Sequence, residues 1–401
     1  MTRQLVLVFL VDTTGSMGPY LNAAKMSIDS IINTIRDSEQ IDMRFGLVEY
    51  KDHKPIEPSF AYKEYGWMTD KDDMVNAVNQ MQAYGGGMDG PESVTCAFDC
   101  AVNFTYRQYA AKVIVWIADA PPHGFHIQYD GFPDGCPCGI DFQKVVLRAV
   151  EKDIQVYAVA AEPIRDIYRH FRDLMRAVAA MTGGQFVPLT SADALGDVII
   201  GGSLEEVSMM EVVRQIQYRL EADAAFKTLP KEEQEKRIRQ EIADYCANTT
   251  IKKVDVNSVF KGTLPDIPKI FFTATTFKEL VDVLKTREPN IYHFKKQMDE
   301  YIPTPQAFWD NNGVADYRRK SMGQYGRRTT AKKERDMIIC DGDDFTLYRG
   351  VNYPTEGAIE VPKEAPVEFK EGEVVRIAEA PVDDVHKEKL AERLIKRMGA
   401  L

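Results

Sequence analysis

The chain has 401 residues, 44% of them apolar, so it is long enough for two or three domains and at least one sizeable core. Its 61 acidic and 50 basic residues give a net charge of −11, which argues against general nucleic-acid binding. No stretch approaches the roughly 18 apolar residues of a membrane helix, and no signal peptide is recognisable. Six cysteines in this length do not resemble a disulfide framework, so we expect a reducing, cytoplasmic compartment.

The first element is an unbroken apolar run over residues 5–11, which is typical of a strand buried on both faces of a parallel sheet. The run stops at Asp12, and Thr14 and Ser16 then place hydroxyl oxygens at alternate positions of a glycine-containing turn. A helical pattern follows over residues 20–36. We expect the chemistry of the protein at this turn; in the simpler alternative, its polar side chains only cap the helix.

The next elements alternate between strand and helix. Strands are predicted at residues 44–50, 59–63, 112–118, 154–160 and 185–188, and helices at 70–82, 92–106, 141–152, 164–181 and 192–200. This order is typical of a doubly wound, mostly parallel α/β sheet of the Rossmann-like kind, with right-handed crossovers. Such sheets bind ligands outside the carboxyl ends of their strands, where the strand order reverses.

Two more acidic positions fit that crevice. The buried strand at 112–118 ends at Asp119, and a loop over residues 84–92, with four glycines in nine residues, contains Asp89. Hard oxygen ligands favour Mg²⁺, Ca²⁺ or Mn²⁺ over zinc or copper. The predicted metal ligands are Asp12, Thr14, Ser16, Asp89 and Asp119.

The D-x-T-x-S turn, the glycine-rich loop and Asp119 together resemble the metal-ion-dependent adhesion site (MIDAS) of von Willebrand factor type A (VWA) domains. The resemblance covers residues 1–205 and includes FGLVEYKDH at 45–53, ADAPPHG at 118–124 and FPDGCPCG at 132–139. It is greatest to the intracellular branch that includes the α-kinase-associated A domains. The resemblance implies a VWA domain in which Asp12, Thr14, Ser16 and Asp119 hold a divalent ion, most favourably Mg²⁺.

The third loop departs from the family pattern, because Asp89 stands where many adhesion-type members have a threonine. In the adhesion mechanism a partner's carboxylate supplies the last ligand of the ion. A further carboxylate near the ion weakens its attraction for that incoming group. The sequence therefore supports metal binding more strongly than carboxylate binding.

Other polar residues leave alternatives open. Asp52 and His53 follow the second strand and either support the metal site as outer-shell groups or form a solvated turn. His123, His126, Cys136 and Cys138 could form a zinc site. Only one residue separates the two cysteines, however, so we favour a proline-stiffened loop without zinc.

No catalytic arrangement is recognisable. The glycine-rich loop lacks the lysine and hydroxyl of a P-loop, and no nucleophile elbow is present apart from a chance match at residues 14–18. Carboxylates around an ion could activate water, but no general acid or base can be placed beside them. The second half also lacks the motifs of an α-kinase, so we do not expect an enzyme.

In the second half of the sequence, the alternation of strands and helices gives way to a mainly helical pattern. Residues 206–290 are predicted as a helical and mixed extension, with helices near 209–220, 231–246 and 276–286 and a short strand at 269–273. Residues 291–401 are predicted as an extended, partly irregular region. It contains a basic segment at 318–335, a proline- and glutamate-rich connector at 354–381 and an amphipathic helix at 386–398.

The function that we expect is an intracellular, metal-dependent protein-binding adaptor or scaffold module, with partners at the metal face and at the C-terminal region. We expect no membrane and no nucleic-acid partner. The alternative is a structural subunit of a larger assembly, in which the C-terminal region makes the main contacts and the metal only stabilises the fold.

Overall fold

The computed structural model describes the greater part of the first 290 residues and a C-terminal segment. The described residues are 3–38, 41–87, 89–125, 130–161, 164, 168, 170–188, 192–247, 249–256, 269–287, 338–341, 344–347 and 375–399. His126 and the basic segment at 318–335 lie outside them.

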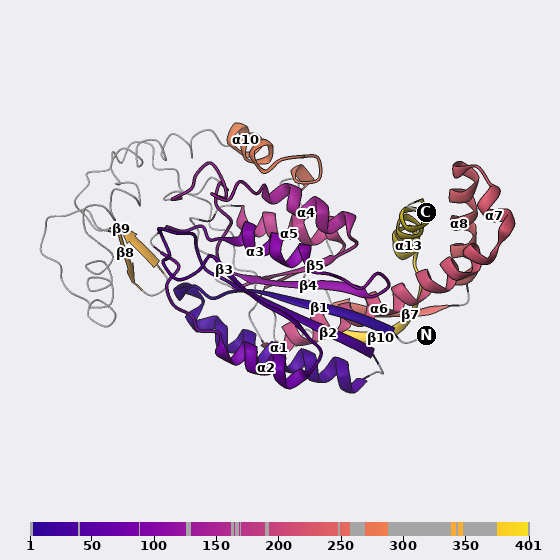
Figure 1. Ribbon diagram of the computed structural model, residues 1–401, viewed down its shortest axis with the longest axis horizontal. Helices are drawn as coiled ribbons and strands as arrows, with labels where there is room; N and C mark the ends of the chain where they lie inside the picture. The colour runs from indigo at the N-terminus through magenta and orange to yellow at the C-terminus, as the bar shows by residue number, and fades with distance from the viewer. Residues whose placement is uncertain are drawn as a thin grey trace, which may run out of the picture.

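A six-stranded sheet forms the centre of the molecule, in the order β3-β2-β1-β4-β5-β6 (Figure 1). Its neighbours pair in parallel except β3, which is an antiparallel edge strand. The predicted doubly wound, mostly parallel fold is therefore confirmed. The strands are β1 (Arg3–Asp12), β2 (Ile41–Tyr50), β3 (Tyr62–Met68), β4 (Ala111–Ala118), β5 (Gln155–Ala160) and β6 (Phe186–Pro188).

The strand order reverses between β1 and β4. From β1 the chain moves outward to β2 and β3, whereas from β4 it moves the other way to β5 and β6. In the register of the two strands, Val11 lies opposite Ile117, so Asp12 and Asp119 leave the sheet at the same edge. This edge is the switch point at which such sheets bind ligands.

Two apolar cores cover the two faces of the sheet. Leu5, Leu7 and Phe9 belong to one core, and Val6, Val8 and Leu10 belong to the other. Alternate side chains of a strand point to opposite faces, so a strand buried on both sides must be apolar throughout. The first core packs under α1 (Gly18–Ser38), α2 (Lys71–Gln80) and α6 (Ala192–Ala222), and the second under α3 (Val94–Asn103), α4 (Phe142–Glu151) and α5 (Phe171–Thr182) (Figure 1).

Asp141 caps two helices at once. Its Oδ1 accepts a hydrogen bond from Lys144 N at the start of α4, and both its carboxylate oxygens accept from Phe277 N at the start of α10 (Phe277–Arg287). A carboxylate at this position satisfies amide groups that have no partner within the helix. The cap fixes α10 against the outer face of α4.

The strand predicted at 269–273 is wrong, because this segment forms a helical turn. Gln143 Nε2 donates hydrogen bonds to Phe271 O at 2.7 Å and Ala274 O at 3.0 Å, and the Phe271 side chain is buried. The side-chain amide satisfies backbone carbonyls that a strand neighbour would otherwise engage. A short apolar run does not reveal this difference.

The helical pattern predicted at 192–200 continues without a break in α6 as far as Ala222. The boundary that we expected at residue 205 therefore falls inside one helix. Val213, Ile216 and Leu220, which lie beyond it, are buried in the same core as β1. The helices α7 (Ala224–Thr228) and α8 (Lys231–Cys246) follow.

The C-terminal segment returns to the sheet domain. β10 (Val375–Pro381) pairs antiparallel with β7 (Thr250–Val256), so the end of the predicted connector is an ordered strand and that part of the prediction is wrong. The pairing partner is far away in sequence, where a local pattern cannot show it. The last helix, α13 (Asp384–Gly399), buries Leu390 and Leu394 in the first core. A further pair, β8 (Ile338–Asp341) and β9 (Asp344–Leu347), is antiparallel.

The second half of α6 lies at the amino ends of the strands, and α13 lies there too. Arg3 at the start of β1 forms an ion pair with Glu211 of α6, and Arg397 of α13 donates to Gln108 O just before β4. The carboxyl ends of the strands, where Asp12 and Asp119 lie, are at the other edge of the sheet. Among the described residues, no helix combines the length and apolar character needed to cross a membrane.

Candidate metal centre

The turn after β1 gathers its polar oxygens around Asp12. Asp12 Oδ1 accepts hydrogen bonds from Thr14 N at 2.8 Å and Thr14 Oγ1 at 2.7 Å, and Thr14 Oγ1 lies 3.0 Å from Ser16 Oγ. Asp12 is fully buried, and its Oδ2 has no hydrogen-bond partner among the described residues. Burial, followed by the charge of Asp119, raises the pKa of Asp12 well above its ordinary value. The structure thus brings Asp12, Thr14, Ser16 and Asp119 to one place.

The glycine-rich loop lies directly over this turn. Gly15 N donates to Gly85 O at 2.9 Å, and Tyr84 N donates to Thr13 O at 3.2 Å. At Gly86, φ is +96°, and a Cβ atom there would lie 2.6 Å from Thr14 Cβ. Only glycine combines this backbone conformation with so close an approach. The loop is also held from outside, because Glu57 Oε2 accepts a hydrogen bond from Gly86 N at 2.8 Å.

The loop ends at Glu92, a buried carboxyl group that the sequence analysis missed. Its amide donates to Pro121 O at 2.9 Å, which fixes the residue beside the segment that follows β4. Its Oε2 has no hydrogen-bond partner among the described residues. Burial is the main cause that raises the pKa of Glu92, and the charges that raise it further are those of Asp52, Asp12, Asp89 and Asp119, in that order. The charge of Glu92 therefore interacts with those of all four aspartates.

Asp89 lies on the other side of this cluster. Its Oδ2 accepts a hydrogen bond from Gly131 N at 2.8 Å and is 3.8 Å from His123 Nδ1. Its Oδ1 has no partner among the described residues. Burial is the largest cause that raises the pKa of Asp89, and the charge of Asp52 is the next. For Asp12, the charge that follows burial is that of Asp119. Asp52, Asp89 and His123 form one compact group whose ligand atoms lie within 4.8 Å of one another.

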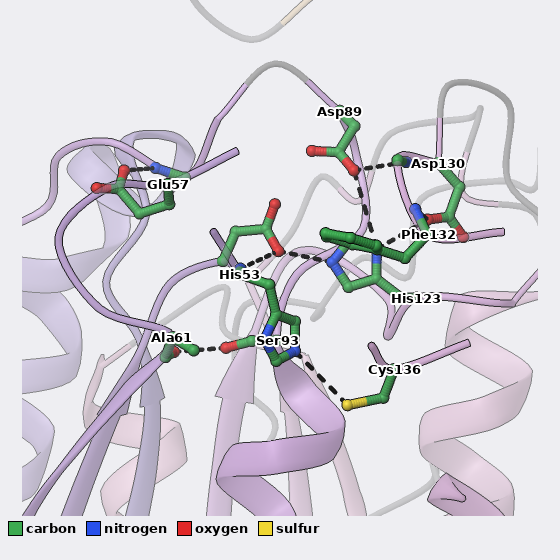
Figure 2. A network of polar contacts seen from close by, with 12 residues as sticks. His53, Glu57, Ala61, Asp89, Ser93, His123, Asp130, Phe132 and Cys136 are labelled. Carbon is green, nitrogen blue, oxygen red and sulfur yellow. Dashed lines mark hydrogen bonds and ion pairs between the residues drawn. The ribbon is translucent and has the colours of Figure 1, made fainter. Parts of the chain in front are cut away.

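His123 joins two aspartates, as Figure 2 shows for Asp130. Its Nε2 lies 2.6 Å from Asp52 Oδ1, and its Nδ1 lies 2.8 Å from Asp130 Oδ1. Burial alone lowers the pKa of His123, but the charges and hydrogen bonds of the two aspartates outweigh it and raise that pKa well above its ordinary value. His123 therefore belongs to the acidic cluster and is not one of the residues grouped with Cys136.

Asp52 and His53 are both buried, so they do not form a solvated turn. His53 N donates a hydrogen bond to Asp52 Oδ1, but the Nε2 atom of the His53 ring faces Cys136. Its Nε2 lies 3.6 Å from Cys136 Sγ (Figure 2). The two neighbouring residues thus contribute to two different groups.

Negative charge exceeds positive charge in this part of the described structure. Lys51 and His123 partly offset it, but the Lys51 ammonium group donates to Thr13 O at 2.8 Å and to Tyr84 O, and burial lowers its pKa to about 8. Buried carboxyl oxygens without partners are costly unless a proton or a cation joins them. The donor set, carboxylates and hydroxyls without sulfur, suits a hard divalent cation. The buried carboxyl groups that form the acidic cluster are Asp12, Asp52, Asp89, Glu92, Asp119 and Asp130.

Residues 6–131 match the family model described as the von Willebrand factor A domain. The chain is 31% identical over 154 residues to the alpha-protein kinase vwkA of Dictyostelium discoideum, a match that covers 38% of this chain and 24% of that protein. It is 26% identical over 196 residues to the putative ariadne-like RING finger protein R811 of Acanthamoeba polyphaga mimivirus, covering 47% of this chain and 18% of that one. The chain thus spans a quarter or less of the length of these relatives.

Solved structures of low sequence identity are also similar. They include the pilus adhesin SpaC of Lactobacillus rhamnosus GG in its open conformation, with a TM-score of 0.39, 12% identity and coverage of 52% of this chain and 30% of that one. A von Willebrand factor type A structure from Catenulispora acidiphila has a TM-score of 0.36 and 12% identity, with coverage of 51% and 43%.

Proposed function

We propose that this chain is an intracellular protein-binding module that holds a divalent cation at the carboxyl ends of β1 and β4, because residues 6–131 match the von Willebrand factor A domain model. The A domain is an interaction domain, not a catalytic family. One curated relative is named as a kinase, but the chain covers too little of that protein for its activity to be transferred.

The observation that carries the proposal is the set of buried carboxyl oxygens without hydrogen-bond partners among the described residues. Asp12 Oδ2 and Glu92 Oε2 are two of them, and each residue has its pKa raised by the charge of Asp119. A divalent cation would compensate these charges where a hydrogen bond does not. Mg²⁺ is the ion that we favour, with Ca²⁺ and Mn²⁺ as alternatives.

We propose that Asp12, Thr14, Ser16 and Asp119 hold this ion and that Glu92 supplies the oxygen from the glycine-rich loop. Asp89 is the other candidate for that last role. The charge of Asp52 acts first on both residues, but we prefer Glu92 because the charges of Asp12 and Asp119 act on it as well, and because its Oε1 and the Thr14 side chain both lie against Gly86. Asp52, Asp130 and His123 then form an outer layer that keeps the loops in place.

Three carboxylates around one ion also affect the choice of partner. Their charges reduce the attraction of the ion for a partner's aspartate or glutamate. We therefore propose that the ion mainly fixes the surrounding loops and that the partner binds to the surface that they form.

Affinity capture from native lysate tests this function. We expect Asp12→Ala, or EDTA in place of Mg²⁺, to remove the partners that wild-type protein retains, while circular dichroism shows the fold intact. Unchanged retention in EDTA and with Asp12→Ala counts against the proposal.

An internal replacement separates this function from the alternative, a structural subunit that binds through its C-terminal region. Replacing residues 291–374 with a long, flexible glycine–serine linker allows β10 and α13 to keep their places in the first core. The metal-face proposal expects the partners to be retained after this replacement. The alternative expects them to be lost while metal binding persists.

A further inference from the structure

Three cysteines and one histidine from distant parts of the chain meet beside the metal face. His53 follows β2, Cys96 lies in the first turn of α3, and Cys136 and Cys138 lie in the loop before α4. One ligand atom from each of the four residues lies within 4.8 Å of the other three. The zinc site considered from the sequence shares only Cys136 and Cys138 with this group, because His123 lies among aspartates and His126 is outside the described residues.

The distances within this group resemble those between ligands of a tetrahedral zinc ion. With Zn–S bonds of about 2.3 Å and Zn–N bonds of about 2.0 Å, neighbouring ligand atoms are roughly 3.5–3.8 Å apart. Cys136 Sγ lies 3.6 Å from His53 Nε2 and 3.3 Å from Cys96 Sγ. Small movements of the side chains would suffice to bring all four atoms to one ion.

The chemistry of the group separates it from the acidic cluster. Three sulfur atoms and one imidazole nitrogen are soft ligands that suit zinc and do not suit Mg²⁺ or Ca²⁺. A disulfide does not account for the group, because the Cys96 and Cys136 sulfur atoms are 3.3 Å apart and a third thiol, Cys138, lies beside them. Cys100, one turn further along α3, points instead toward Glu64.

We propose that His53, Cys96, Cys136 and Cys138 bind a structural zinc ion. Four protein ligands leave no open position, as in structural rather than catalytic zinc sites. The short Cys136-Pro137-Cys138 spacing is acceptable because the other two ligands come from other elements. Sequence spacing alone could not reveal this, since Cys96 and His53 are 40 and 83 residues from Cys136.

Through its ligands, the zinc ion connects the loop at 130–141 to Cys96 of α3 and to His53 in the loop after β2. That same loop carries Asp130, which binds His123, and Gly131, which binds Asp89. His53 is also adjacent in sequence to Asp52, which belongs to the acidic cluster. The zinc site therefore stabilises the loops that form one side of the metal face, without sharing a ligand with the site at Asp12.

Elemental analysis of the full chain, purified without a histidine tag or chelator and then supplied with zinc, tests the proposal. We expect about one zinc per chain in wild type. Cys96→Ser and Cys138→Ser should each lose it, whereas Cys100→Ser, Cys246→Ser and Asp12→Ala should retain it. Wild type without stoichiometric zinc, or cysteine variants that retain it, would overturn the proposal.

Two further measurements use the wild-type protein, so they do not require any variant to fold. Substitution with Co²⁺ should produce thiolate-to-cobalt charge-transfer absorption, which carboxylate and imidazole ligands do not give. In mass spectrometry after alkylation, the exposed thiol of Cys138 should be modified in zinc-free protein and protected in zinc-loaded protein. Absence of the absorption band, equal modification of Cys138 in both forms, or a Cys96–Cys136 disulfide in freshly prepared protein would each contradict the zinc site.

Discussion

His123 Nε2 lies 2.6 Å from Asp52 Oδ1, so the loop after β4 contacts the loop after β2 inside a buried acidic cluster. The imidazole binds Asp130 on its other side. The His123 ring thus bridges the carboxylates of Asp52 and Asp130. The loops of the metal face are thus joined by a charged contact that no single motif contains.

Replacing His123 with Gln should destabilise the protein. Removing one member of a buried ion pair leaves the other charge uncompensated, which costs about 3–5 kcal/mol. Chemical denaturation in the absence of metal measures the loss. Lys236→Gln is the matched control, because its i,i+4 pair with Glu232 is exposed and contributes less than about 1 kcal/mol. Equal stabilities of the two variants would refute the structural role of His123.

Glu92→Gln should weaken Mg²⁺ binding more than Asp89→Asn does. Loss of groups that only orient metal ligands costs about 10–100-fold in affinity, so loss of a charged ligand should cost at least about 10-fold. Both changes preserve side-chain size and remove one charge. Isothermal titration calorimetry compares them directly, and a larger effect of Asp89→Asn would move the assignment to Asp89.

Arg393→Met should release α13 from the sheet domain. Arg393 is buried, with Nε 2.8 Å from Asp153 and Nη1 2.6 Å from Glu206. Its removal leaves these two acidic groups only their longer ion pairs, of Asp153 with Arg397 at 3.7 Å and of Glu206 with Lys389 at 3.8 Å. We expect a loss of about 3–5 kcal/mol in the free energy of unfolding. Hydrogen exchange should show the change in α13 and the end of β10, and Mg²⁺ affinity should stay the same because this region lies at the amino ends of the strands.

Docking of α13 should also depend on pH through His386. The hydrogen bond to Glu205 is the largest cause that raises the pKa of His386, and the hydrogen bond to Asp383 adds to it, whereas burial opposes them. Because the folded-state pKa is raised, the stabilisation is fully present below the unfolded-state value and is lost as pH rises through the folded-state value.

Thermal unfolding of wild type and His386→Gln between about pH 5.5 and pH 9 measures this dependence. The difference between the two proteins should be largest at the acidic end and should shrink as the pH increases. A difference that grows with pH would contradict the assigned contact.

The sequence predicted the centre of the fold well because the signals there are local. Two apolar runs that each end at an aspartate indicate buried parallel strands, and their carboxyl ends share one edge of the sheet. Asp12 and Asp119 follow from that pattern. The glycine-rich loop was also recognisable, but its pattern does not distinguish Asp89 from Glu92, because the difference depends on how the loop folds over Thr14.

Other features depend on contacts between distant residues. Nothing near Cys96 predicts that it lies 3.3 Å from Cys136, and β10 finds its partner β7 more than a hundred positions earlier in the sequence. The limit of the sheet domain was placed inside α6 for a similar reason. The helix continues past residue 205 without a break, and only the folded structure shows that Ile216 and Leu220 share a core with β1.

The position of a bound Mn²⁺ ion tests the central claim most directly. Anomalous scattering from crystals grown with Mn²⁺ locates the ion without assuming its ligands. We predict one peak within coordination distance of carboxyl oxygens of Asp12, Glu92 and Asp119. A peak among Asp52, Asp89 and His123 instead, or no peak at all, would contradict the account.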